Sequence, residues 1–181
     1  MSELAFRPTE VDGAFQLVPE KRADERGFFA RTFSVEIFRE RGLVLPDTQF
    51  SISFNHKRGT LRGMHYQAAP HAETKLVRCT RGRVFDVALD LRPRSPTYLL
   101  WTAAELTADN HEALYIPAGC AHGFITLEDE CELFYQIAPS FEPQSARGVR
   151  FNDPAFGIVW PIPAVVISAR DLGYPDYQPE R

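Results

Sequence analysis

The sequence predicts an all-β protein, built as a β-sandwich or β-barrel with a few short helices. Short runs rich in Val, Ile, Phe, Tyr and Thr recur along most of the chain. Proline and glycine residues separate these runs at a spacing of roughly 8 to 12 residues, which is typical of sandwiches and barrels. Helical patterns are rare, so a layout of alternating strands and helices is not favoured.

Ten segments have the composition of strands. In chain order these are 14–19, 27–33, 48–55, 59–67, 74–82, 83–92, 98–106, 112–117, 122–129 and 131–138. Residues 34–42 form the expected helix, with Ser34 as N-cap and Gly42 as the stop. Residues 107–110 are compatible with a single helical turn.

The end of the chain differs from the rest, because residues 139–181 are proline-rich and contain only short apolar runs. This pattern predicts a C-terminal segment that wraps around the barrel. Its anchoring side chains would be Phe151, Phe156, Ile158 and Trp160. With no internal repeat or linker in the chain, residues 1–181 are predicted to form one domain.

Charge and composition exclude several classes of function. The 181 residues carry a formal net charge of -4, which argues against a nucleic-acid-binding face. The start of the chain lacks the features of a signal peptide, and no apolar run is long enough to span a membrane. Three cysteines without CxxC spacing indicate neither a disulfide framework nor a zinc site. The sequence therefore predicts a cytoplasmic protein that does not bind a membrane.

One motif resembles a cupin metal site. Pro117, Gly119 and His122 match the second half-motif of cupin barrels, but the first half-motif requires two histidines one residue apart. Gln67 stands where the second histidine would be, and glutamine is a poor ligand for zinc or iron. A metal-free pocket is favoured. The alternative is a metal-dependent cupin isomerase or dioxygenase that uses four side chains: His65, His71, Glu73 and His122.

A second set of side chains fits acid–base chemistry. His65, His122 and Tyr135 lie on expected strands, as do the cations Arg62 and Lys75. Pointing into a barrel, a histidine would be a general base near neutral pH, a tyrosine would return a proton, and the cations would stabilise an oxyanion. Each residue taken alone has an ordinary structural explanation. The arginines 26, 31, 58, 62, 78 and 81 could also hold an anion.

Seven motifs, taken in order, resemble the dTDP-4-dehydrorhamnose 3,5-epimerase family over residues 20 to 175. They are ERGFFARTF, RGTLRGMHYQ, TKLVRCTRGRVFDVALDLRPRSPTY, IPAGCAHGFITL, FYQ, FNDPAFGIVWP and ISARD. The resemblance implies a cupin-like double-stranded β-helix, or jelly-roll. It also implies a cofactor-free, metal-free isomerase and a homodimer. The implied reaction is epimerisation at C3, C5 or both in a nucleotide-linked 4-keto-6-deoxyhexose.

The same resemblance implies a role for individual residues. His65 matches the general base, Asp171 its carboxylate partner, Tyr135 the acid on the other face and Lys75 the group near the C4 ketone. The implied substrate-binding set is Arg26, Phe29, Gln49, Ser51, Arg62, His122, Phe141 and Arg170.

The chain departs from the family pattern mainly where ligand would be recognised. Ser51 replaces an asparagine, Arg31 a glutamate, Phe141 a tyrosine or tryptophan, and Arg170 a lysine. These departures keep two alternatives open, a non-catalytic sugar-nucleotide binding protein and an epimerase of C3 alone.

The positions of Arg62 and His65 give a geometric expectation. Residues three apart point to opposite faces of a regular strand. If both serve one cavity, the strand must be bulged or kinked near Gly63, where a glycine permits it.

Overall fold

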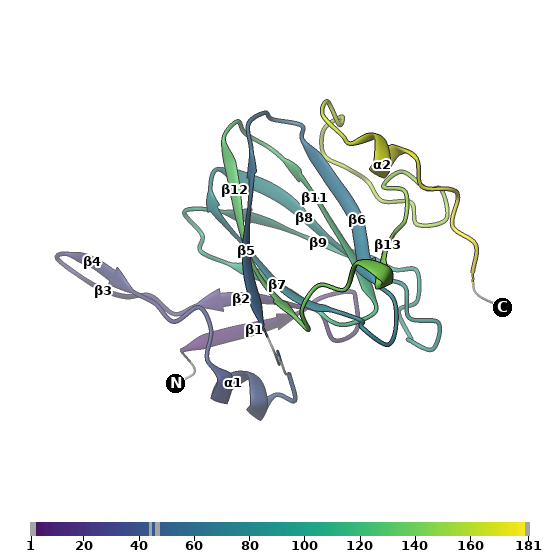
Figure 1. Cartoon of the computed structure of the whole chain (residues 1–181). Coiled ribbons are helices and arrows are strands. Elements are labelled where there is room, and N and C mark those ends of the chain that lie inside the picture. The colour runs from purple at the N-terminus through teal and green to yellow at the C-terminus, as the bar shows by residue number, and fades with distance from the viewer. Residues whose placement is uncertain (1–2, 44, 46–47, 180–181) are drawn as a thin grey trace.

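The strands form two facing antiparallel sheets and a separate hairpin, which extends away from both sheets (Figure 1). The structure is a computed structural model that describes residues 3–43, 45 and 48–179. Its elements are β1 (Leu4–Pro8), β2 (Phe15–Pro19), β3 (Arg22–Asp24), β4 (Gly27–Phe29), α1 (Val35–Glu40), β5 (Gln49–Asn55), β6 (Leu61–Gln67), β7 (Thr74–Arg81), β8 (Arg83–Asp90), β9 (Trp101–Thr107), β10 (Ala113–Ile116), β11 (Cys120–Thr126), β12 (Cys131–Ala138), the 3-10 helix η1 (Pro143–Ser145), β13 (Ala146–Gly148) and α2 (Ala169–Leu172).

The six-stranded sheet has the order β1-β2-β10-β7-β12-β5, and the five-stranded sheet has the order β13-β6-β11-β8-β9. Strands distant in sequence lie side by side, as β7 does between β10 and β12. This crossing between two sheets is consistent with the predicted jelly-roll, and the all-β class is confirmed.

The main core lies between the two sheets. Leu114, Ile116 and Leu133 project from the six-stranded sheet against Val84 and Phe124 of the five-stranded sheet. Each of these side chains is almost fully buried, because alternate residues of each strand face inward.

Each sheet is also covered on its outer side. Helix α1 places Phe38 over the six-stranded sheet, and the Oγ of Ser34 accepts a hydrogen bond from the Ile37 amide as the predicted N-cap. The C-terminal segment covers the five-stranded sheet with Phe156, Ile158 and Trp160. These contacts confirm the predicted wrapping segment, within which the ring of Phe151 packs against Trp160.

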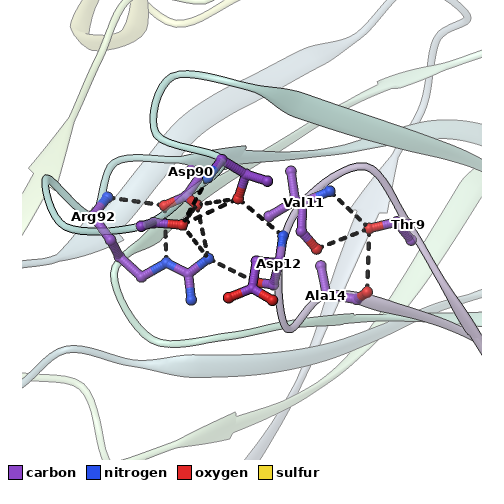
Figure 2. Close-up of polar contacts among 8 residues, drawn as sticks. Thr9, Val11, Asp12, Ala14, Asp90 and Arg92 are labelled. Atoms are coloured by element: carbon purple, nitrogen blue, oxygen red, sulfur yellow. Dashed lines mark hydrogen bonds and ion pairs between the residues drawn. The ribbon is translucent and has the colours of Figure 1, made fainter.

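A buried aspartate ties the loop after β8 to the turn between β1 and β2 (Figure 2). Asp90 is fully buried and accepts hydrogen bonds from Arg92, Ser95 and Thr97. Arg92 also donates to the Asp12 carbonyl at 2.6 Å, and Thr97 Oγ1 accepts from the Asp12 amide at 3.0 Å. Burial raises the pKa of Asp90, but the three donors outweigh it and hold the pKa at about 2.

Some predicted elements are wrong. The strand expected over 27–33 ends at Phe29, and residues 108–110 form a turn rather than a helical turn. Strands β1, β3 and β13 were not predicted, and neither was α2. Among the described residues, no helix is long and apolar enough to cross a membrane.

Candidate active site

A cavity of about 320 Å³ opens between the two sheets. Most of the side chains implied as catalytic or substrate-binding line it: Gln49, Ser51, Arg62, His65, Lys75, His122, Tyr135 and Phe141. They come from β5, β7 and β12 of one sheet, from β6 and β11 of the other, and from the loop after β12. The barrel interior therefore brings together residues that are far apart in sequence.

Strand β6 is irregular at the predicted point. His122 of β11 pairs with His65, but Phe124 pairs with Arg62, so β6 contains one extra residue between them. This bulge lies at Gly63, where an added Cβ would sit 2.5 Å from the Gly123 Cα. Arg62 and His65 consequently line the same cavity, as expected.

The His65 imidazole is paired with Asp171. Its Nε2 lies 2.7 Å from Asp171 Oδ1, and Asp171 Oδ2 accepts a hydrogen bond from the Gly63 amide at 3.3 Å. Asp171 is held in α2, whose N-cap Ser168 accepts from the Asp171 amide. Because a carboxylate accepts the Nε2 proton, the lone pair of the neutral ring lies on Nδ1.

Burial lowers the pKa of His65, and electrostatic interaction with Lys75 and His122 acts in the same direction. The hydrogen bond and negative charge of Asp171 oppose this shift without cancelling it. The imidazole is therefore neutral at neutral pH and able to accept a proton.

Lys75 lies on the opposite sheet, and its Nζ is 2.8 Å from Glu73 Oε1 and 3.1 Å from the His65 carbonyl. Both charged side chains are buried, which keeps the ammonium in place beside the cavity. The sequence placed Glu73 only in the alternative metal set, whereas the structure shows it as the partner of Lys75.

Tyr135 faces the cavity from β12, with its ring centroid 5.8 Å from that of His122. His122 Nε2 is bonded in turn to Asp86 Oδ1 at 2.8 Å. Burial and the charge of Asp86 raise the pKa of Tyr135 well above its usual value, although Arg62 opposes the shift. The phenol thus keeps its proton at neutral pH and can donate it.

Asp86 was not predicted as part of the site. Its side chain is fully buried, and its Oδ2 has no hydrogen-bond partner among the described residues. The only signal in the sequence was an acidic residue inside the alternating strand 83–92.

Three predicted substrate-binding residues do not line this cavity. Arg26 and Phe29 lie on the β3–β4 hairpin, where Arg26 pairs with Asp24 and Phe29 is 65% exposed. Arg170 lines a neighbouring cavity and donates through Nε to the Tyr174 hydroxyl at 3.0 Å. Of the six arginines considered for anion binding, Arg62 is the one that lines the cavity between the two sheets; Arg31, for example, pairs with Glu3.

Each of the alternative metal ligands is bonded to another side chain of the protein. His71 Nδ1 bonds to Ser145 Oγ at 2.9 Å, Glu73 pairs with Lys75, and His122 pairs with Asp86. Within the described ranges, no group of three or more His, Cys, Asp or Glu side chains could hold a metal ion.

The geometry supports proton transfer at two faces of one bound molecule. The neutral imidazole of His65 lies on the five-stranded sheet, and the protonated phenol of Tyr135 lies on the six-stranded sheet. Lys75 contributes a positive charge to the same pocket. This arrangement suits a reaction that removes a proton from one side of a carbon and returns it to the other.

Comparison with known proteins gives consistent matches. A family model described as dTDP-4-dehydrorhamnose 3,5-epimerase matches residues 8–178. A protein of that name from Methanothermobacter thermautotrophicus is 42% identical, over 96% of this chain and 95% of its own length. A dTDP-4-dehydrorhamnose 3-epimerase from Streptomyces niveus is 37% identical, over 93% of this chain and 81% of its own.

Solved structures show the same architecture. The crystal structure of dTDP-4-dehydrorhamnose 3,5-epimerase from Bacillus anthracis, with TDP and PPi bound, superposes with a TM-score of 0.91. It is 33% identical to this chain, and the match covers 96% of this chain and 99% of that one.

Proposed function

The chain belongs to the dTDP-4-dehydrorhamnose 3,5-epimerase family, and we propose that four side chains of its cavity divide the reaction between them. It is an isomerase that epimerises C3, C5 or both in a nucleotide-linked 4-keto-6-deoxyhexose. In the proposed assignment His65 is the base, Asp171 its partner, Lys75 the oxyanion donor and Tyr135 the acid.

The first half of the reaction is proton abstraction by His65. The hydrogens on C3 and C5 are acidic because both carbons are adjacent to the C4 ketone. Removal of either proton by Nδ1 gives an enolate, which carries its negative charge on the C4 oxygen. The Lys75 ammonium stabilises that oxygen, and one such donor typically contributes about 3 to 4 kcal/mol. No hydride acceptor is needed, because the substrate is neither oxidised nor reduced.

The second half is reprotonation from the opposite side by Tyr135. The phenol stands on the sheet facing His65, and its raised pKa keeps it protonated. Delivery of its proton to the enolate carbon inverts the centre. The same base and acid can invert either C3 or C5, because both carbons are adjacent to the C4 ketone.

We propose a dTDP-linked sugar as substrate. Phe141 lies at the mouth of the cavity, 55% exposed, where its ring can stack on a base. The Phe141 amide donates to Gln49 Oε1 at 3.4 Å, which ties this loop to β5. Arg62, Ser51 and His122 offer donors to the diphosphate and the sugar.

We also propose that the enzyme is a homodimer. Arg26 and Phe29 lie on a hairpin that extends away from its own barrel (Figure 1), yet the family resemblance implies that both bind substrate. Both statements hold if the hairpin reaches the cavity of a second copy. Mass photometry, together with mixing of Phe29→Ala and His65→Asn chains, tests this arrangement, because mixed dimers would regain activity.

Residues 1–181 are proposed to act as one epimerase domain, supported by the family match over 8–178. A cytoplasmic location is proposed as well. All three cysteines are buried and unpaired, as is usual for proteins of a reducing compartment.

The observation that carries the proposed mechanism is the His65–Asp171 pair beside Lys75, facing Tyr135. The test is incubation with dTDP-, GDP- and CDP-4-keto-6-deoxyhexoses in deuterated water, read by mass spectrometry and NMR. Deuterium should enter C3 and C5 of the dTDP sugar, and folded His65→Asn should show none. His56→Asn is a matched control, because His56 is a surface residue paired with Glu130. Exchange in His65→Asn would show that the base is wrongly assigned.

A narrower function is epimerisation at C3 alone, which the name of the Streptomyces niveus relative favours. Deuterium confined to C3 would identify it. Binding of the sugar nucleotide without any exchange would instead indicate a non-catalytic paralogue.

A further inference from the structure

Tyr174 lies directly on the backbone of β13, beside the proposed base. Strand β13 pairs with β6 so that Gly148 stands opposite His65. A Cβ added at Gly148 would lie 2.2 Å from the Tyr174 Cζ and 2.5 Å from its hydroxyl oxygen. Gly148 does not have a positive φ, so the glycine provides space for the ring rather than an unusual backbone conformation.

The Tyr174 ring also contacts His65. The two ring centroids are 6.4 Å apart with an interplanar angle of 69°, an edge-to-face arrangement. Rotation of an imidazole about its Cβ–Cγ bond has broad minima, so one hydrogen bond defines its plane only loosely. A ring packed against its side restricts that rotation.

Tyr174 is held by hydrogen bonds to its hydroxyl and to its backbone carbonyl. Its hydroxyl accepts a hydrogen bond from Arg170 Nε at 3.0 Å, and its carbonyl accepts from Arg150 Nη1 at 3.5 Å. Arg170 and Tyr174 are four residues apart, on either side of Asp171 in the sequence. Since α2 has a single turn, which is too short to be stable by itself, such a brace helps to hold Asp171 in place.

We propose that Tyr174 is a positioning residue for His65: its ring, seated on Gly148 and held by Arg170, fixes the plane of the imidazole while Asp171 fixes Nε2. The proposal rests on the proposed role of His65 as the base. It gives Arg170 a function that does not require contact with substrate, because Arg170 acts through Tyr174.

The experiment compares Tyr174→Ala, Tyr174→Phe and Gly148→Ala. Kinetics of deuterium exchange give kcat and KM, and side-chain ¹⁵N NMR reports the state of the His65 ring. Tyr174→Ala and Gly148→Ala should lower kcat about 10- to 100-fold, because misplaced catalytic groups cost this much. KM should change by less than about twofold, because substrate contacts remain. Both variants should shift the His65 ¹⁵N resonances.

Tyr174→Phe keeps the ring and should retain kcat within about threefold of the unmodified enzyme, since it loses only one hydrogen bond. Tyr177→Ala is the matched control. Tyr177 belongs to the same C-terminal segment, but its ring packs on Phe156 and its hydroxyl bonds to Tyr98. Its removal should leave the His65 resonances unchanged.

A folded Tyr174→Ala protein with unchanged kcat and unchanged His65 resonances would overturn the proposal. If the alanine variant does not fold, Tyr174→Leu keeps apolar bulk on Gly148 without an aromatic ring, and a kcat equal to that of Tyr174→Phe would overturn it. Failure of the proposed function looks different: exchange would then persist in His65→Asn, whatever the result at Tyr174.

Discussion

Asp171 Oδ1 lies 2.7 Å from His65 Nε2, although 106 residues separate the two in sequence. Asp171 belongs to the C-terminal segment, which packs on the outside of the five-stranded sheet and brings Asp171 to His65 at α2. The wrapping segment therefore completes the proposed acid–base pair as well as covering the barrel.

Replacement of Asp171 by Asn should lower kcat/KM by about 10²- to 10⁴-fold, the range for loss of an acid–base group. The acid limb of the pH profile should also move. Burial lowers the pKa of His65, which puts this limb below pH 6.5, and Asp171 partly opposes that shift. Without Asp171 the limb should therefore lie at still lower pH. An unchanged limb in a folded variant would contradict the assigned pairing.

Tyr135→Phe should separate exchange from inversion. His65 can still remove a proton and return a deuteron on its own side, so label should enter the starting sugar. Inverted product should form about 10²- to 10⁴-fold more slowly, because the acid on the other face is gone. NMR of the sugar after incubation in deuterated water distinguishes the two outcomes. Equal loss of exchange and inversion would mean that Tyr135 has another role.

Asp86→Asn tests the buried partner of His122. A hydrogen bond to a charged group contributes roughly 1.5 to 3 kcal/mol, which corresponds to about 10- to 100-fold in rate if it serves the transition state. The variant should also lower the pKa of Tyr135, because the negative charge of Asp86 helps to raise it. NMR titration of the Tyr135 ring measures this change directly. Normal kinetics with an unchanged Tyr135 titration would assign Asp86 a purely structural role.

The Asp90 network should make stability depend on pH in a narrow acid range. The pKa of Asp90 is about 2 in the folded protein and 3.8 in its reference state. This difference contributes about 2 kcal/mol of stability, fully present above pH 4 and lost as the pH falls towards 2. Urea unfolding of the unmodified chain and of Asp90→Asn between pH 5 and 2.5 should show a difference that shrinks in this window. A difference independent of pH would contradict the pKa shift.

The sequence predicted most strands because their signals are local. The segment 83–92 alternates in polarity and ends at turn residues, and it forms β8. Helix α2 was missed because four residues carry no helical periodicity; it is stabilised by Ser168 and by packing near β6. The strand predicted over 27–33 is too long. Aromatic residues indicate a strand from the local sequence, whether or not a neighbouring strand is available to pair with it.

The candidate site was predictable only in part. Residue types suggested His65 and Tyr135, but Asp171 came from the family resemblance, since nothing local shows which distant carboxylate meets a histidine. Alternation in 83–92 placed Asp86 and Asp90 together on one face, yet both are fully buried. Alternation of polar and apolar residues predicts which residues share a face of a strand. It does not reveal that both faces are covered by other parts of the protein.

The extra residue in β6 changes which residues of the strand face the cavity. Before Gly63 an even-numbered residue, Arg62, points into the cavity; after it the odd-numbered His65 does so, while Met64 packs outside under the C-terminal segment. Deleting one residue here would exchange the inward-facing and outward-facing residues over half the length of the strand. The His65 imidazole would then lie on the outer side of the sheet.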